Sequence, residues 1–157
     1  LFRGGQEGVL REDLIKVNLI EAVIGLPANL FFGTGIPAAV LLFDKSRTRR
    51  GLTDVLFIDA SREFEEGKNQ NRLGDAHLKK ILSTHHAYAS AEKYAYRATA
   101  QELADNDYNL NIPRYVDTFE EEAEIDLPAV KQEIARLEDE LATVRRRMDG
   151  YLKELGL

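Results

Sequence analysis

The chain has 157 residues, of which 44% are apolar and 31% charged, and this composition is typical of a folded domain rather than of a disordered segment. No apolar run reaches the ~20 residues of a membrane span, and the absence of cysteine excludes disulfides and cysteine-ligated zinc, so we expect a cytoplasmic protein without a membrane partner. The net charge of −6 argues against a domain whose main task is to grip phosphate groups.

The first part of the chain predicts a small α/β unit. Residues 6–17 carry a one-sided apolar stripe, which indicates a short helix. Three apolar segments predict largely buried strands: 19–26, 36–43 and 55–60. Pro37 fits the start of the second strand, because a proline cannot donate a ladder hydrogen bond and is tolerated best at a strand end. A polar and basic connector, residues 44–54, separates the second strand from the third.

After residue 60 the chain becomes more polar, and helices follow. Asp75 is a candidate N-cap for a helix over residues 75–86. The spacing Thr99-x-x-Glu102 predicts a capping box that begins a second, short helix. These changes of pattern predict a first domain over 1–117, ending in an extended asparagine-rich segment docked on it (106–117), then an acidic linker over 118–126 and a helical arm over 127–157.

The helical arm shows a regular heptad pattern. Apolar residues recur in alternating steps of three and four, which places them at the a and d positions of a coiled-coil helix: Leu127, Val130, Ile134, Leu137, Leu141, Val144, Met148, Tyr151 and Leu155. An isolated helix would leave this stripe in water, so we expect it to dock on helices of another chain. The flanking charges give one repulsive and one attractive pair in a parallel self-pair, so an antiparallel contact or a different partner fits better.

The segment NLFFGTGIP, residues 29–37, links the first two predicted strands and is long for a hairpin loop. Its asparagine, glycines and proline suit a turn, but a turn has no need of two adjacent phenylalanines. We expect one of them to pack in the core beneath the loop. The functional alternative is an aromatic platform that stacks on a planar ligand such as a flipped base. The candidate binding residues are Asn29, Phe31, Phe32, Gly33 and Gly35.

No set of catalytic residues is recognisable from spacing alone. His77, His85 and His86 have no cysteine or carboxylate at metal-ligand spacing, so we expect no metal site. The basic connector offers three candidates for phosphate contact, although such a run is more often a solvated link: Arg47, Arg49 and Arg50. The segments KNQNR (68–72) and YNLNIPR (108–114) are rich in asparagine, which in loops commonly bonds to its own backbone.

Four stretches of the sequence together resemble one protein family. In chain order they read IEAVIGLPANLFFGTGIPAAVLLFDK, VLFIDAS, KNQNRL and NDYNLNIPRYVD. They resemble the later part of the modification (M) subunit of type I restriction-modification systems, which are adenine-specific DNA methyltransferases. The resemblance runs from Leu1 to about Leu127, and the final helix is similar in position and heptad character.

The resemblance implies an α/β fold: the C-terminal portion of a Rossmann-like methyltransferase sheet, with the late hairpin, an added strand and helices, followed by a long coiled-coil-type helix. Members of the family transfer a methyl group from S-adenosyl-methionine to the exocyclic amino group of adenine. The sequence contains neither the family's Asn-Pro-Pro-Phe-type loop nor its acidic-Pro-x-x-Gly-x-Gly loop, and its only methionine is Met148. We therefore expect a piece of a longer subunit, inactive by itself, whose cofactor site and catalytic residues lie elsewhere.

The resemblance also implies partners. M subunits of this family join a specificity (S) subunit, further M and restriction subunits and, through the complex, double-stranded DNA. The heptad helix would be the arm that docks on the S subunit, and Phe31 or Phe32 would contact the flipped adenine. The competing hypothesis is a non-enzymatic α/β adaptor whose coiled-coil arm associates with itself, and the sequence upstream of Leu1 would distinguish the two.

Overall fold

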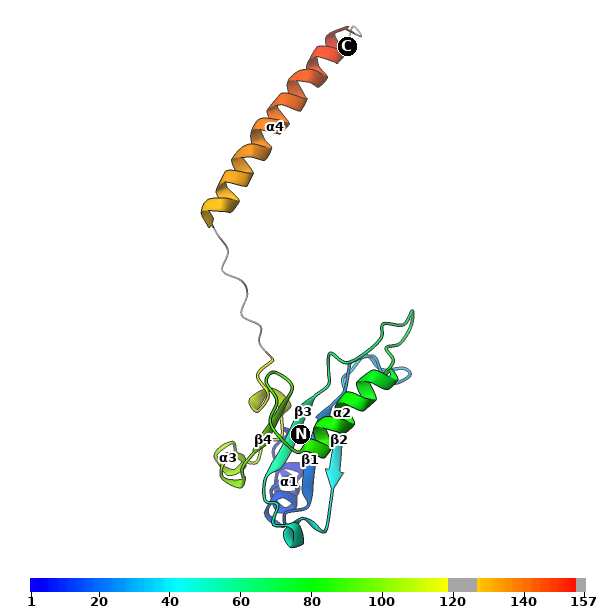
Figure 1. The fold of residues 1–157 in the computed structure, drawn as a ribbon, viewed down its shortest axis with the longest axis vertical. Coiled ribbons are helices and arrows are strands. Elements are labelled where there is room, and N and C mark those ends of the chain that lie inside the picture. Colours follow the sequence, from blue (N-terminus) through cyan, green and yellow to red (C-terminus); the bar gives the residue numbers. More distant parts are fainter. Residues whose placement is uncertain (119–126, 155–157) are drawn as a thin grey trace. The chain divides into compact units, whose positions relative to one another are not determined.

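A computed structural model describes residues 1–118 and 127–154, and the chain divides into two units, residues 1–119 and 120–157. Figure 1 traces the elements along the chain. The first unit contains α1 (Gln6–Lys16), β1 (Ile20–Gly25), β2 (Ala39–Phe43), the 3₁₀ turn η1 (Arg47–Arg50), β3 (Val55–Asp59), α2 (Asp75–Ala87), β4 (Ala95–Ala98), α3 (Ala100–Asp105) and the 3₁₀ turn η2 (Ile112–Arg114), and the second contains α4 (Leu127–Glu154). None of the helices in the described ranges is long and apolar enough to cross a membrane.

A four-stranded sheet with the strand order β2-β1-β3-β4 organises the first unit. β1 runs antiparallel to β2 and parallel to β3, and β4 pairs antiparallel with the outer side of β3. In this register Val23 of β1 lies between Leu41 of β2 and Phe57 of β3. Parallel strands need a crossover connection instead of a tight turn, and here β2 and η1 form part of the connection from β1 to β3.

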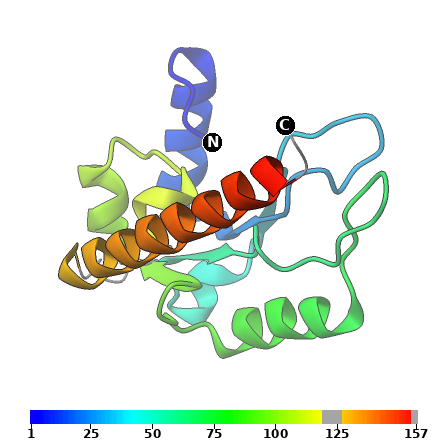
Figure 2. The ribbon, with the colours of Figure 1, turned by 90° about the horizontal axis from the view of Figure 1, so that it is seen from above.

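The central strands β1 and β3 are buried on both faces, because each is an almost continuous apolar run. Alternate side chains enter two separate cores. The first core gathers around Phe57, whose ring stacks on Tyr115 with the centroids 3.9 Å apart, and Leu14 of α1 packs at its margin. The second gathers around Leu56 and includes Ile81 of α2. Figure 2 shows α1 and α2 on opposite sides of the sheet, in agreement with these two cores.

The strand predictions are confirmed for β1 and β3, but the predicted burial of the segment 36–43 is wrong. β2 begins only at Ala39, and its side chains are exposed or half-exposed. The reason is its place in the sheet, since among the described residues β2 pairs with β1 alone and its outer edge is free. Val40, Leu41 and Phe43 are therefore exposed despite being apolar. The sequence pattern does not predict β4, because four residues are too few to establish an alternation.

The helix predictions are confirmed with small changes at their ends. The capping box of α3 forms as predicted, with Thr99 Oγ1 accepting from the N–H of Glu102 at 3.2 Å and Glu102 Oε2 accepting from the N–H of Thr99 at 2.7 Å. The cap position of α2 is Gly74, and the predicted cap Asp75 is the first helical residue. The segment 106–117 docks on the sheet as expected, through the buried residues Leu110, Ile112, Tyr115 and Val116. It is not extended throughout, because residues 112–114 form the 3₁₀ turn η2.

The predicted arm is a helix, α4, of 28 described residues. At ~1.5 Å per residue its length is about 42 Å. The last residues of the predicted arm, 155–157, lie outside the described residues, as does most of the predicted linker, 119–126. The pairing of this helix in a coiled coil stays a prediction.

Candidate functional site

The aromatic loop, residues 29–37, lies at the carboxyl end of β1. The two chain segments that flank the loop are joined by a hydrogen bond, in which the N–H of Leu26 donates to the carbonyl of Ala38 at 2.8 Å. β1 and the neighbouring β3 run parallel, so their carboxyl ends share one edge of the sheet. In open α/β sheets ligands bind outside this edge. The aromatic loop therefore stands where a ligand is expected.

Neither phenylalanine of the aromatic loop is buried, so the expectation that one of them is core is wrong. Phe32 is 97% exposed and Phe31 is 50% exposed. Leu30 takes the core position instead, since its half-buried side chain packs against the core that includes Ile81 of α2. A loop lacks the periodicity that marks a buried face in a helix or strand, so the sequence does not separate these three apolar neighbours. Both rings are available to a ligand.

The main chain of the aromatic loop passes twice through the left-handed region. Asn29 has a φ of 55°, a conformation that asparagine tolerates better than most residues, and Gly33 has a φ of 76°. A side chain at Gly33, directly after Phe32, would be strained. The Oγ1 of Thr34 accepts from the N–H of Ile36 at 3.2 Å. Gly35 has an ordinary φ and open space around it, so nothing in the structure explains a glycine there.

A second loop is bonded to the aromatic loop. The N–H of Asn71 donates to the carbonyl of Asn29 at 2.8 Å, and Asn71 Nδ2 donates to the carbonyl of Ala28 at 2.9 Å. Gln70 Nε2 donates to the carbonyl of Leu30. The interpretation of KNQNR as a segment that bonds to its own backbone is therefore wrong for these two residues. Their side-chain partners lie 40 and 43 residues earlier, and only the unusual composition of the segment marks it in the sequence.

A cavity of about 380 Å³ opens beside the aromatic loop. Its lining joins the two most distinctive stretches of sequence, with Ile36 and Pro37 from the aromatic loop and Asn111–Pro113 from the segment docked on the sheet. Within that docked segment, Asn109 Oδ1 accepts from the N–H of Asn111 at 2.9 Å, which confirms the local bonding predicted for it. Asp59, at the end of β3, is the one ionisable side chain among the lining residues. Such a lining suits a largely apolar ligand.

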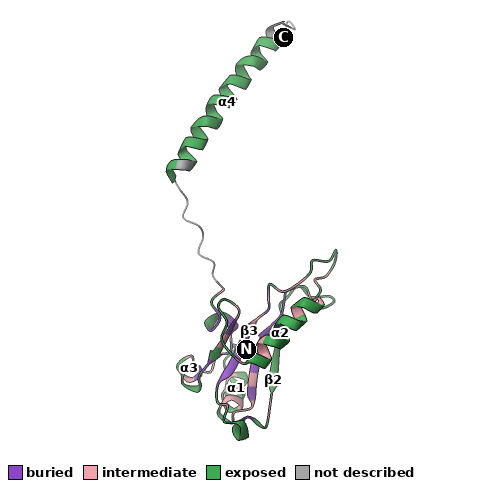
Figure 3. Ribbon diagram, in the orientation of Figure 1, coloured by how far each residue is buried: buried purple, intermediate pink, exposed green. Residues whose placement is uncertain are grey.

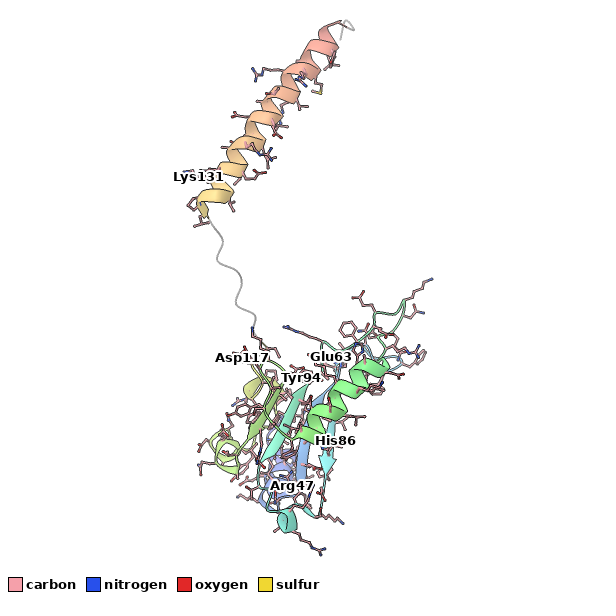
Figure 4. The ribbon with its side chains drawn as sticks, in the orientation of Figure 1. Arg47, Glu63, His86, Tyr94, Asp117 and Lys131 are labelled. Atoms are coloured by element: carbon pink, nitrogen blue, oxygen red, sulfur yellow. The ribbon has the colours of Figure 1, made fainter. Side chains whose placement is uncertain are left out.

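The basic connector lies at the other end of β1, away from the aromatic loop. Arg47 is fully buried and donates to two main-chain carbonyls, one of them that of Ile20 at the start of β1 (Figure 4). Its predicted phosphate contact is wrong, because the guanidinium is buried and hydrogen-bonded to main-chain carbonyls inside the domain. Arg50 forms an ion pair with Asp44. Arg49 and Arg50 are both exposed, so phosphate contact stays a prediction for these two residues.

The Tyr94 hydroxyl is not a candidate base at neutral pH. Burial raises the pKa of the Tyr94 hydroxyl to about 12, with the carboxylate of Glu63 acting in the same direction. The ammonium of Lys80 lies 4.1 Å from the centroid of the Tyr94 ring. A tyrosine with so high a pKa stays protonated at neutral pH and cannot accept a proton there. Within the part of the chain that the structure describes, no group of three or more His, Asp or Glu side chains could hold a metal ion.

α4, taken by itself, exposes all of its described apolar seam (Figure 3). The exposed fractions range from 45% at Val130 to 71% at Leu127. The described members are Leu127, Val130, Ile134, Leu137, Leu141, Val144, Met148 and Tyr151, whereas Leu155 lies outside the described residues. Beside the seam, Arg136 pairs within the helix with both Glu133 and Glu140 at 2.5 Å. These pairs partly neutralise the acidic middle of the helix.

Comparison with known proteins gives a consistent result. The sequence profile of the N-6 DNA methylase family matches residues 1–124. The methylase subunit of the type I restriction enzyme MjaVIII from Methanocaldococcus jannaschii is 33% identical, over 99% of this chain and 28% of that protein. The methylase subunit of the type I restriction enzyme MpnII from Mycoplasma pneumoniae is 28% identical, again over 99% of this chain and 28% of that protein. The chain thus spans little more than a quarter of the length of these curated relatives.

Solved structures agree with the sequence relatives. The crystal structure of the type I restriction-modification system methyltransferase subunit from Streptococcus thermophilus has a TM-score of 0.72 at 53% identity, covering 76% of this chain and 25% of that one. A chain from a structure describing complex assembly and conformational transition of the type I system has a TM-score of 0.56 at 16% identity, covering 98% of this chain and 34% of that one. The second likeness concerns the fold alone. Both support a mixed α/β unit with a four-stranded sheet.

Proposed function

Because this chain belongs to the N-6 DNA methylase family, we propose that it forms part of the methyltransferase subunit of a type I restriction-modification system. In the intact subunit the activity transfers a methyl group from S-adenosyl-methionine to the exocyclic amino group of adenine in double-stranded DNA. Because the substrate is DNA, the proposed location of the subunit is the cytoplasm. The family match over residues 1–124 and the 53% identity to a solved methyltransferase subunit support this proposal. The same relatives do not favour a non-enzymatic adaptor.

The cavity beside the aromatic loop does not fit the cofactor, so we assign cofactor binding to the rest of the subunit. S-adenosyl-methionine presents a cationic sulfonium, an amino-acid group and a ribose, which together need several convergent polar and charged partners. The cavity beside the aromatic loop offers Asp59 as its one ionisable side chain, and Asp59 Oδ1 already accepts from the N–H of Ser61 at 2.9 Å. No step of methyl transfer is assigned to this chain, and we expect the chain alone to be inactive.

The contribution proposed for this chain is a stacking surface for the flipped adenine. An enzyme that modifies a base inside a duplex must extrude that base, and it holds the base by stacking against aromatic side chains. The observation that carries the proposal is the exposure of Phe31 and Phe32, which are adjacent in the sequence, on a loop at the edge of the sheet where ligands bind in open α/β folds. Asn29 and Gly33 supply the left-handed turns that shape this loop.

The test is the replacement of each phenylalanine by alanine in the full-length subunit bound to its S subunit. Loss of a base–aromatic stack costs ~1–3 kcal/mol, which corresponds to a fall in kcat/KM of about 5- to 150-fold. Since Phe32 is almost fully exposed, Phe32→Ala should change the free energy of unfolding by less than about 0.5 kcal/mol. Leu30→Ala, in the core, should instead lower the melting temperature. Wild-type methylation rates in both phenylalanine variants would refute the stacking role.

Residues 1–117, within the first unit, are proposed as the C-terminal part of the catalytic domain, with β1 and β2 as the late hairpin of its sheet. The outer edge of β2, which no strand in the described part of the chain covers, and its exposed apolar side chains support this, because proteins normally cover or blunt an apolar edge strand. The preceding part of the subunit would pair with this edge. Hydrogen exchange of the β2 amides in the full-length subunit tests the idea, and rapid exchange there would contradict it.

α4 is proposed as the arm that docks on the S subunit, with residues 118–126 as the linker before it. Its exposed apolar seam supports this role, since soluble proteins rarely leave so long a stripe in water. Base recognition would then lie largely in the S subunit, which agrees with the net charge of −6 of this chain. Further M and restriction subunits complete the proposed assembly, and Arg49 and Arg50 are its proposed phosphate contacts.

A further inference from the structure

We propose that Gln70 and Asn71 are positioning residues, which hold the aromatic loop in the orientation that receives the target base; this inference rests on the stacking role proposed above. Together they bond to three consecutive main-chain carbonyls, those of Ala28, Asn29 and Leu30. These three residues directly precede Phe31. The two loops lie side by side at one end of the sheet in Figures 1 and 2.

The bonds restrain the direction of the aromatic loop. Three consecutive carbonyls tied to a second loop leave the chain before Phe31 little freedom to rotate. Among the tied residues, Asn29 has a φ of 55°, an uncommon conformation that persists where the surroundings hold it. Leu30 is also fixed through its side chain in the core. The exposed ring of Phe32 therefore projects from a segment that is held on two sides.

The loop that carries the two amides, Glu65–Arg72, is closed at its own ends. The N–H of Glu65 donates to the carbonyl of Arg72 at 2.8 Å, and the N–H of Arg72 donates back at 2.9 Å. Within the loop, a Cβ at Gly67 would lie 2.2 Å from the carbonyl oxygen of Gln70, so this close approach requires glycine. The loop is thus built to present Gln70 and Asn71 at a defined place.

Side-chain amides are the groups that this arrangement needs. A main-chain carbonyl only accepts hydrogen bonds, so Asn71 Nδ2 and Gln70 Nε2 must donate. A carboxylate of the same shape would place one acceptor against another, and Asn71→Asp therefore removes the bond with little change of volume. The main-chain bond from Asn71 to Asn29 does not involve the side chain and is kept in Asn71→Asp, so the fold should persist.

The experiment uses the full-length subunit bound to its S subunit, with Asn71→Asp compared to Asn69→Asp. Asn69 is exposed in the same loop, and its replacement makes the same change of charge. We expect faster hydrogen exchange over residues 28–36 and a fall in kcat/KM of about tenfold for Asn71→Asp, and neither change for Asn69→Asp. In a background that carries both Phe31→Ala and Phe32→Ala, Asn71→Asp should cause no further loss, because its effect acts through the rings.

Unchanged exchange over residues 28–36 in Asn71→Asp would overturn the proposal. A loss of activity of the same size in the background without the phenylalanines would also overturn it, since it would show a general effect on the fold. If the two phenylalanine replacements alone leave methylation unchanged, the stacking role fails and the positioning role fails with it. If the phenylalanine variants have no effect, the stacking role fails. If the phenylalanine variants lose activity but Asn71→Asp has no effect, only the positioning role fails.

Discussion

Replacing Leu141 by glutamate should separate the arm from its partner while leaving the first unit folded. Leu141 lies in the middle of the exposed seam of α4, with 49% of its surface exposed. Full burial of a leucine stabilises by ~1.5–3 kcal/mol, so burial of the exposed half contributes about 1 kcal/mol. The new carboxylate would in addition lose its hydration without gaining a partner. The two effects together cost ~3–5 kcal/mol, which weakens binding by about two to four orders of magnitude.

The assay is the dissociation constant between the full-length subunit and its S subunit, measured by titration calorimetry. Ala142→Glu is the matched control, because it introduces the same charge about 100° around the helix, away from the seam. Glutamate is a good helix former, so both variants should keep the helical circular dichroism of the wild type. Undiminished binding by Leu141→Glu would refute the seam as the interface. Equal losses in the two variants would show that charge, and not the apolar seam, controls docking.

Two further predictions concern the first unit within the full-length subunit. Arg47→Leu should destabilise it by about 2–4 kcal/mol because the buried carbonyls of Ile20 and Asp54 lose their hydrogen bonds from the guanidinium, whereas Arg49→Leu, at an exposed position, should change stability by less than about 0.5 kcal/mol; equal midpoints of urea denaturation would contradict the burial of Arg47. The Tyr96 hydroxyl, together with capping bonds from Thr99, holds the pKa of Glu102 below its ordinary value of 4.5, so its contribution to stability is complete above that pH and is lost as the pH falls through the lowered pKa. Glu102→Gln should therefore lower stability at neutral pH and make stability depend less on pH in the acid range. Profiles of melting temperature against pH that run parallel for the variant and the wild type would exclude this role.

Local patterns predict most of the elements of this fold. The runs of β1 and β3 are apolar over their whole length, and a strand with such a sequence must be covered on both faces wherever it lies. The heptads of α4 and the capping box of Thr99 and Glu102 likewise involve residues three or four apart. Such signals lie within one or two turns of a helix or within one strand, so they can be read without knowing what the element packs against. The unusual composition of residues 29–37 located the candidate site in the same way.

Tertiary structure alone decided which of these residues are buried and what holds the site. The segments IEAVIG and AVLLF are similar in composition, yet β1 is central whereas β2 pairs on one side only among the described residues, because burial depends on which strands pair across the sheet. In the same way Leu30 and not a phenylalanine enters the core, and Arg47 in a basic run is buried. The bond from Asn71 to Ala28 spans 43 residues. A sequence states that an amide can donate, but only the fold decides which carbonyl lies within reach, since a hydrogen bond depends on distance in space and not along the chain.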